Sequence, residues 1–346
     1  MSRGAKLPPR PVIFGCEGLR LSSAEALFFE DAQPLGFILF SRNCRDPAQI
    51  RNLVQGLRRS VGRGDAPVLI DQEGGRVQRL GPPFWRSAPC ARLFGDLAAH
   101  GPELAVEAAR LNARLIAAEL CDLGINVDCA PVLDIPAAGG HEVIGDRAFS
   151  DDPEMVARLG RAMCEGLLAG GVTPLIKHVP GHGRAKADSH LSLPVVDAPA
   201  RVLEGTDFKP FAALSDMPLA MTAHVVYAAF DASSPATTSR AMIDRVIRTM
   251  IGFEGILVSD DIGMGALSGT HAERATAALA AGCDIVLHCN GNLDEMKEVA
   301  KAIEPMARQA RDRAIQAFGR GGAPDRADIA AIEARLDCIL DQKGFE

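Results

Sequence analysis

The sequence predicts a single (β/α)₈ barrel with extra helices after the last strand. Short apolar segments alternate with longer amphipathic segments along the 346 residues of the chain. The apolar segments are almost continuously hydrophobic rather than alternating, as expected for a parallel sheet that is covered by helices. Eight such segments occur, which is the number of strands that closes this type of barrel.

The expected strands are short and rich in β-branched residues. They are Pro11–Cys16, Leu35–Phe40, Pro67–Ile70, Ile125–Leu133, Val172–Ile176, Leu219–Thr222, Gly255–Val258 and Asp284–Leu287. A doubly wound open sheet is the alternative arrangement. The turn after its first strand would normally carry a GxGxxG pattern for a dinucleotide, and FGCEGLRLSS does not supply one.

The expected helices lie between these strands and show apolar residues at helical spacing. They include Pro47–Arg59, Pro102–Leu123, Pro153–Leu168, Arg240–Ile251 and Ala272–Ala281. No Ser/Pro-rich linker divides the chain, so we expect one domain over residues 1–346, with a barrel core over about 10–303. The segment 304–346 is expected to add one or two helices, separated by the turn GRGGAPD.

Composition excludes several classes of partner. The net charge is −7 and no block of five or six like charges occurs, so nucleic acid and anionic membrane surfaces are not expected partners. No apolar run approaches the length of a membrane span, and prolines interrupt the N-terminal segment where a signal peptide needs an apolar core. The nine cysteines form no CxxC pair and suit reduced, mostly buried thiols. We therefore expect a cytoplasmic protein.

Strongly polar residues stand at the C-terminal ends of several predicted strands. They are Asp71, Gln72 and Glu73; Lys177 and His178; His224; Ser259, Asp260 and Asp261; and His288 and Asn290. In a barrel the loops that follow the strands converge at one face, where active sites are built. The pattern therefore predicts a functional site at this face.

The first interpretation of the segment KHVPGHGRAKADSHLSLP is a metal site. His178 and His182 have the i, i+4 spacing of zinc ligands on a helix, but the intervening Val-Pro-Gly cannot be helical. The first predicted strand also lacks the HxH pattern of barrel metallohydrolases. We therefore expect neither a catalytic metal nor another cofactor.

The second interpretation of this segment is a site for acid–base chemistry. Asp188 lies two residues before His190, so its carboxylate can bond one ring nitrogen and raise the basicity of the other. Asp260 ends a buried strand with no base beside it, and it suits a carboxylate nucleophile or an anionic stabiliser. A protonating imidazole and a carboxylate nucleophile together suit displacement at an acetal carbon with retained configuration. The remaining polar side chains suit sugar hydroxyls: Asp71, Arg79, Arg147, Lys177 and His178.

Three motifs resemble glycoside hydrolase family 3, and within it the single-domain bacterial β-N-acetylglucosaminidases. They are DQEGGRVQRL, KHVPGHG…ADSHLSLP and ILVSDDIGMGA, and the resemblance extends from GFILFSRN to CDIVLHCN. It implies that Asp260 is the nucleophile and that His190 is the general acid/base with Asp188 as its partner. It also implies sugar contacts from Asp71, Arg79, Lys177, His178 and Arg147. The expected substrate is a small carbohydrate, a GlcNAc–anhydro-muropeptide from cell-wall turnover, acted on by a monomer.

Two positions depart from the family pattern. Val179 replaces the usual phenylalanine after Lys-His, and Gly265-Ala266 stands where an acidic residue usually follows the SDDxxM methionine. Two other functions also remain open. A family 3 phosphorylase would use phosphate in place of water, and a non-catalytic sugar-binding protein would not need an acid–base loop.

Neighbouring polar residues have simpler expected roles. Strand alternation points Asp261 away from Asp260, and His182 is expected to stabilise its loop. His224 and His288 suit either the pocket or a buried, hydrogen-bonded position, and Trp85 suits ordinary packing.

Overall fold

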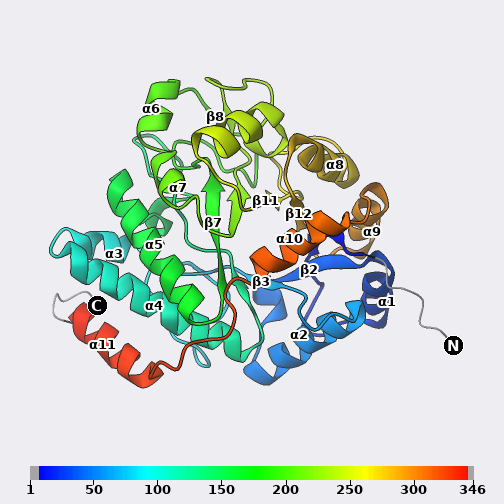
Figure 1. Ribbon diagram of the computed structural model, residues 1–346, viewed down its shortest axis with the longest axis horizontal. Coiled ribbons are helices and arrows are strands. Elements are labelled where there is room, and N and C mark those ends of the chain that lie inside the picture. Colours follow the sequence, from blue (N-terminus) through cyan, green and yellow to red (C-terminus); the bar gives the residue numbers. More distant parts are fainter. Residues whose placement is uncertain (1–7, 342–346) are drawn as a thin grey trace.

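Eight parallel strands form a closed barrel in the computed structural model, which describes residues 8–341 (Figure 1). In chain order the barrel strands are β1 (Arg10–Phe14), β2 (Pro34–Leu39), β3 (Val68–Ile70), β6 (Val127–Asp128), β7 (Thr173–Val179), β9 (Leu219–Thr222), β11 (Ile256–Asp261) and β12 (Ile285–His288). The first strand pairs with the last, with Val12 opposite Val286, and this pairing closes the sheet. The predicted fold class is confirmed.

Several strand boundaries differ from the prediction, and three of the differences concern the site. The seventh strand, β11, runs on to Asp261 rather than ending at Val258, so Ser259, Asp260 and Asp261 form its end. The fourth strand is only Val127–Asp128, because Pro131 has no N–H for a ladder and only Val132 continues the pairing, with Lys177. The fifth strand runs on to Val179, because Lys177 and Val179 still pair with β9. Lys177 and His178 therefore lie in the strand rather than in the loop after it, and their positions are fixed by the sheet.

Helices surround the barrel and follow the capping signals of the sequence. The longer ones are α1 (Ser23–Ala32), α2 (Pro47–Val61), α3 (Ala91–Ala98), α4 (Pro102–Asp122), α5 (Pro153–Ala169), η4 (Met242–Met250), α8 (His271–Ala281), α9 (Leu293–Ala302), α10 (Arg308–Phe318) and α11 (Ile329–Asp341). In α2, Asp46 caps the N-terminus, Pro47 opens the helix, and Gly62 ends it at a φ of 59°. The predicted helix Arg240–Ile251 is η4, which has π-helical rather than α-helical bonding.

Shorter elements complete the loops. They are α6 (Ala200–Gly205), α7 (Lys209–Ala213), the 3₁₀ turns η1 (Ser41–Asn43), η2 (Gly145–Arg147) and η3 (Ala236–Thr238), the pair β4 (Gln72–Gly74) and β5 (Val77–Gln78), and the pair β8 (Val195–Val196) and β10 (Val226–Tyr227).

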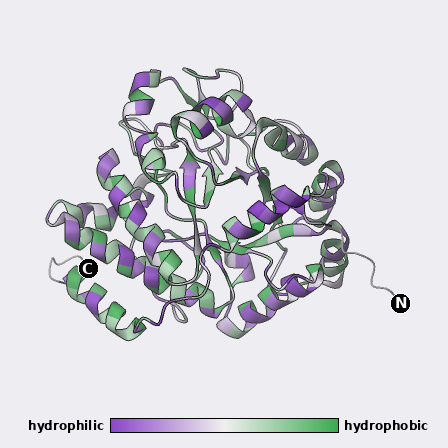
Figure 2. Cartoon of the chain, viewed as in Figure 1, coloured by the Kyte–Doolittle hydropathy of each residue, from purple (hydrophilic) through white to green (hydrophobic). Residues whose placement is uncertain are grey.

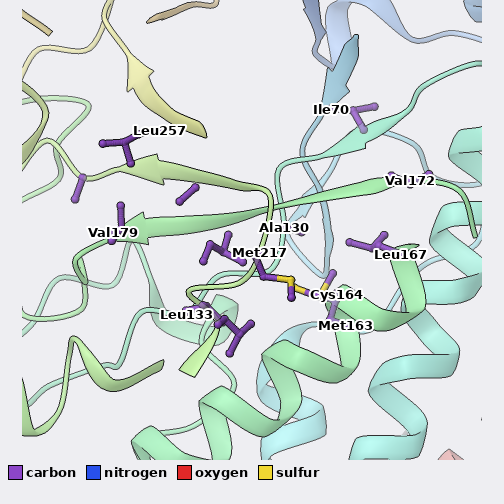
Figure 3. Close-up of a cluster of buried hydrophobic side chains, with 14 of the residues drawn as sticks. Ile70, Ala130, Leu133, Met163, Cys164, Leu167, Val172, Val179, Met217 and Leu257 are labelled. Atoms are coloured by element: carbon purple, nitrogen blue, oxygen red, sulfur yellow. The ribbon is translucent and has the colours of Figure 1, made fainter. Parts of the chain in front are cut away.

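Two apolar layers hold the fold together. The outer layer lies between the strands and the helices, where Leu133, Leu167 and Val172 belong to one cluster of buried side chains (Figure 3). Figure 2 shows the corresponding pattern, in which hydrophilic and hydrophobic residues alternate along the helices. The inner layer fills the barrel with side chains such as Ile38 and Leu175. Both layers are fully buried, as expected for a parallel sheet.

Helix α10 closes one end of the barrel. Met306, Ala314 and Phe318 belong to the inner apolar layer, although they come from outside the strands. Thr173 fixes this contact, because its hydroxyl donates to the carbonyl of Phe318 at 2.9 Å. Since Thr173 begins β7, α10 covers the N-terminal ends of the strands and leaves the C-terminal ends open. The predicted C-terminal helices are therefore present, and residues 342–346 lie outside the described part of the chain.

Two further sequence expectations concern the whole chain. Within residues 8–341, no helix combines the length and the apolar character needed to cross a bilayer. The nine cysteines all lie within these residues and form no disulfide, and five of them are buried: Cys16, Cys129, Cys164, Cys283 and Cys289. Burial raises the pKa of the Cys16 and Cys283 thiols to about 12, so these groups stay protonated and act as small apolar side chains.

Candidate active site

A cavity of about 330 Å³ lies at the open end of the barrel. All eight residues predicted for the site line it: Asp71, Arg79, Arg147, Lys177, His178, Asp188, His190 and Asp260. They come from the ends of three strands, β3, β7 and β11, and from the loops that follow β3, β6 and β7. His224, His288 and Trp85 are not among the lining residues. The structure thus brings together every residue predicted from the sequence and separates them from the three alternatives.

Lys177 is the centre of a buried charge cluster. Its Nζ lies 2.7 Å from Asp71 Oδ1 and 2.6 Å from Glu73 Oε1, and its side chain is 3% exposed. Burial alone would raise the pKa of Asp71, but Lys177 and Arg79 together hold it below its ordinary value. Burial alone would lower the pKa of Lys177, but Asp71 and Glu73 raise it. All of these groups are therefore charged at neutral pH.

Arginines complete the cluster on both sides. Arg79 Nη2 donates to Asp71 Oδ2 at 3.0 Å. Arg147 binds Glu73 through two nitrogens, at 2.8 and 2.9 Å, in the bidentate geometry that fixes a guanidinium in place. Arg147 lines the cavity, but its fork is directed at Glu73. Its main effect in the structure is to hold this carboxylate, and the same contact draws the η2 turn toward the strand ends.

Asp134 positions His178, which lies in β7, and His182, which lies in the loop after that strand. This carboxylate is fully buried, and its Oδ2 accepts the Nδ1–H of His178 at 2.7 Å. Its Oδ1 accepts the backbone N–H groups of His178 and His182. Burial would raise the pKa of Asp134, but His178 lowers it, so the carboxylate is ionised. The Nδ1–H bond leaves Nε2 as the free nitrogen of the His178 ring.

The loop that carries Asp188 and His190 contains a local acid–imidazole pair. Asp188 Oδ1 accepts the Nδ1–H of His190 at 2.8 Å and its backbone N–H at 2.9 Å. Burial would raise the pKa of Asp188, but these two N–H groups keep it below its ordinary value. The His190 side chain is 62% exposed, so its Nε2 is accessible to a ligand. The predicted pairing is present.

Backbone contacts dock this loop against the end of β11. The N–H of Gly265 donates to the carbonyl of His190, and the N–H of Ala266 donates to that of Ser189, both at 3.1 Å. His182 adds a third contact through its Nε2, which lies 3.0 Å from Ser189 Oγ. Burial lowers the pKa of His182 to about 4, so this ring is neutral. These contacts agree with a loop-stabilising role for His182.

Gly265 makes the docking sterically feasible. A Cβ at this position would lie 2.9 Å from the carbonyl oxygen of His190 and 3.0 Å from that of Leu191. One of the two departures from the family pattern therefore lies where the loop backbone packs closely against the segment that follows β11. A side chain here would have to displace the backbone that carries His190.

Asp260 presents a carboxylate at the end of β11. Its Oδ1 accepts the N–H of Asp261 at 2.8 Å. Burial would raise its pKa, but His224 and His178 lower it, so Asp260 is ionised at neutral pH. Asp261 also lines the cavity, but its Oδ1 accepts the backbone N–H groups of Gly263 and Cys289. Asp261 therefore supports the local backbone, and Asp260 is the carboxylate better placed for chemistry.

Comparison with known proteins identifies the family. Residues 18–316 match the family described as glycosyl hydrolase family 3 N terminal domain. The chain belongs to glycoside hydrolase family 3. A β-hexosaminidase of Alkalilimnicola ehrlichii is 41% identical over 284 residues, covering 81% of this chain and 80% of the relative. One from Xanthomonas oryzae pv. oryzae is 38% identical over 337 residues, covering 95% and 97%.

A solved structure extends the likeness to three dimensions. NagZ from Neisseria gonorrhoeae, in complex with N-trifluoroacetyl-D-glucosamine, superimposes with a TM-score of 0.83 at 34% identity. The match covers 98% of this chain and 96% of that one. This family 3 chain is accordingly a glycoside hydrolase of the β-N-acetylhexosaminidase type, as the motifs predicted.

Two residues that shape the site were given no role from the sequence. Glu73 stands in the motif DQEGG, but its partner Arg147 is 74 positions away, and no local pattern joins them. Asp134 directly follows the predicted strand Ile125–Leu133, and this position at a strand end was the available signal. Both are buried acids that act by holding other side chains.

Proposed function

We propose that this enzyme is a retaining exo-β-N-acetylglucosaminidase that forms a covalent bond between the sugar and Asp260. The observation that carries the proposal is the shared cavity of an ionised Asp260 and a paired Asp188–His190. A two-step displacement requires a nucleophile and a separate acid/base, and here both line the same cavity.

In the first step Asp260 attacks the anomeric carbon. The bond from that carbon to the leaving oxygen breaks, and protonated His190 gives its Nε2 proton to the leaving group. In the second step neutral His190 removes a proton from water, which attacks the same carbon and releases Asp260. The proton taken from water restores the protonated form of His190. The two inversions together retain the configuration of the anomeric carbon. Asp188 stabilises the imidazolium form and fixes the ring, because it holds Nδ1–H.

The charge cluster supports recognition of a single terminal sugar. Asp71 offers acceptors for hydroxyl groups, whereas Arg79 and Lys177 offer donors. The cavity volume of about 330 Å³ is at the low end for ligand pockets, which suits removal of one residue from a chain end. The N-acylated glucosamine bound to the gonococcal NagZ supports a GlcNAc unit. We propose a cytoplasmic monomer whose substrate is a GlcNAc–anhydro-muropeptide of cell-wall turnover.

A chromogenic substrate panel tests this function. β-GlcNAc should be cleaved much faster than β-glucose or β-xylose, and NMR of the first product should show the β-anomer. A fluorinated, slowly released glycoside should label the peptide that contains Ser259–Gly263, and Asp260→Ala should lose both labelling and activity. An inverted product, or a label on Asp261, would contradict the mechanism.

Phosphorolysis is the second candidate, and His190 is the observation that favours it. A neutral imidazole does not repel an incoming phosphate as a carboxylate acid/base would, and Arg76 also lines the cavity. Reactions run in phosphate and in an inert buffer separate the two activities, because only a phosphorylase yields the sugar 1-phosphate. Binding of GlcNAc with no turnover in either buffer would instead indicate a sugar-binding protein.

A further inference from the structure

A second cluster of potential metal ligands lies outside the catalytic cavity. His271 is the first residue of α8, His288 is the last residue of β12, and Glu295 stands in the first turn of α9. These three elements meet at the rim of the barrel (Figure 1). Within residues 8–341, this is the only group of three His, Cys, Asp or Glu side chains whose ligand atoms all lie within 4.8 Å of one another.

The distances in this cluster match the edges of a tetrahedral site. Glu295 Oε2 lies 3.4 Å from His271 Nε2 and 3.3 Å from His288 Nε2. Zinc–ligand bonds of about 2.0–2.2 Å give a tetrahedron with edges of roughly 3.3–3.6 Å. Ordinary N–H···O hydrogen bonds are shorter, at about 2.7–3.2 Å. Two of the three edges are thus already spaced for a shared ion, and all three ligand atoms lie within 4.8 Å of one another.

Surrounding amides hold the carboxylate in place. Asn292 Nδ2 donates to Glu295 Oε1 at 3.1 Å, and Asn290 Nδ2 donates to Oε2 at 2.5 Å. Carboxylates that bind metals are commonly fixed in this way by outer hydrogen bonds. The arrangement orients Glu295 toward the two imidazoles before any ion arrives.

One residue of the cluster is buried, and the other two are partly exposed. The His288 side chain is fully buried, whereas those of His271 and Glu295 are 23% and 28% exposed. The buried ring of His288 presents its Nε2 to Glu295, 3.3 Å from Oε2. The exposed side gives an ion access and leaves room for a water as fourth ligand. Two imidazoles favour a borderline cation such as Zn²⁺ over Mg²⁺ or Ca²⁺, which prefer oxygen ligands.

We propose that His271, His288 and Glu295 form a binding site for a zinc-like divalent cation. The ion would join the start of α8 and the start of α9 to the end of β12. None of the three residues lines the catalytic cavity. The site is therefore expected to brace the rim of the barrel without entering the reaction, and it does not depend on the function proposed above.

Zinc bound per chain tests the proposal. Full-length protein freed of metal is dialysed against Zn²⁺, and bound zinc is measured by elemental analysis. His271→Ala/Glu295→Gln should bind one zinc fewer per chain than the unaltered protein. The control His100→Ala/Glu298→Gln, which changes an exposed histidine beside α3 and a partly exposed glutamate on α9, should bind as many as the unaltered protein. Any zinc held by the imidazoles of the catalytic cavity is common to all samples and cancels.

Thermal unfolding gives a second readout. An ion that binds only the folded state raises Tm as its concentration increases. Zn²⁺ should raise the Tm of the unaltered protein and of the control, and Mg²⁺ should not. The single variant His271→Ala changes a partly exposed helix-start residue, so it tests the site even if the double variant folds poorly. Equal zinc content and an equal Tm rise in His271→Ala and the control would overturn the proposal, as would equal protection by Mg²⁺.

Discussion

Replacing Lys177 with methionine should destabilise the protein by about 3 kcal/mol at neutral pH. Lys177 is nearly fully buried and contacts Asp71 and Glu73 at 2.7 and 2.6 Å. Removing one partner of a buried ion pair costs about 3–5 kcal/mol, because it leaves an uncompensated charge. Here each carboxylate keeps one arginine, Arg79 or Arg147, so we expect the lower part of that range.

The loss should depend on pH in a defined direction. The pKa of Asp71 in the folded protein lies below its ordinary value, so its stabilisation is present above the unfolded-state pKa and is lost as pH falls through the folded-state pKa. Without Lys177 the folded-state pKa rises. The folded variant then takes up protons more readily than the unfolded chain, and its deficit relative to the unaltered protein shrinks as pH falls from about 7 toward about 4.

Urea unfolding of the two proteins at several pH values measures both effects. Lys297→Met is the matched control, because Lys297 is an exposed lysine paired with Asp294 at 3.0 Å on the surface of α9. Its loss should not exceed about 0.5 kcal/mol. A deficit below about 1 kcal/mol for Lys177→Met would refute the assignment of a buried, obligatory charge, as would a deficit that does not change with pH.

Three further predictions concern catalysis. His190→Ala should be slow on natural glycosides by about 10²–10⁴-fold, but much less impaired in the first step for excellent leaving groups, with azide restoring turnover; equal loss on all substrates without azide rescue would argue for a binding role. Activity should survive exhaustive dialysis against EDTA, and a loss that zinc alone restores in the His271→Ala variant as well as in the unaltered protein would establish a metal in the reaction. The loop Gly181–Ser192 should detach when empty and stay docked over bound sugar, so a GlcNAc-like inhibitor should slow hydrogen exchange at the Gly265 and Ala266 amides, which donate to it; unchanged slow exchange would contradict a moving lid.

The site could be predicted where its determinants are local in the sequence. Asp188 and His190 are two residues apart, and Asp260 follows an apolar run directly, so spacing and the convergence of strand ends suffice. Asp134 could not be assigned a role in this way, because its partners His178 and His182 come 44 and 48 positions later. The length of β7 was underestimated because Lys177 and His178 are polar, whereas their burial depends on salt bridges and on Asp134.

The same limit applies to the C-terminal segment. Its helical character is visible in the sequence, but an amphipathic pattern does not say which surface its apolar side covers. Phe318 reaches the inside of the barrel through a contact with Thr173, 145 positions earlier. Contacts of this range are a property of the closed barrel and have no local signal.

The position of α10 has a consequence for synthesis of the protein. All eight strands have been translated once His288 is added, but Met306, Ala314 and Phe318 follow only later. Until they leave the ribosome, the nascent barrel lacks the floor that covers its inner apolar side chains. A chain released early, after β12 but before α10, would carry every residue proposed for catalysis and still expose its core to chaperones, proteases and other nascent chains. Quality control of this enzyme therefore depends on the completion of a helix that takes no part in its chemistry.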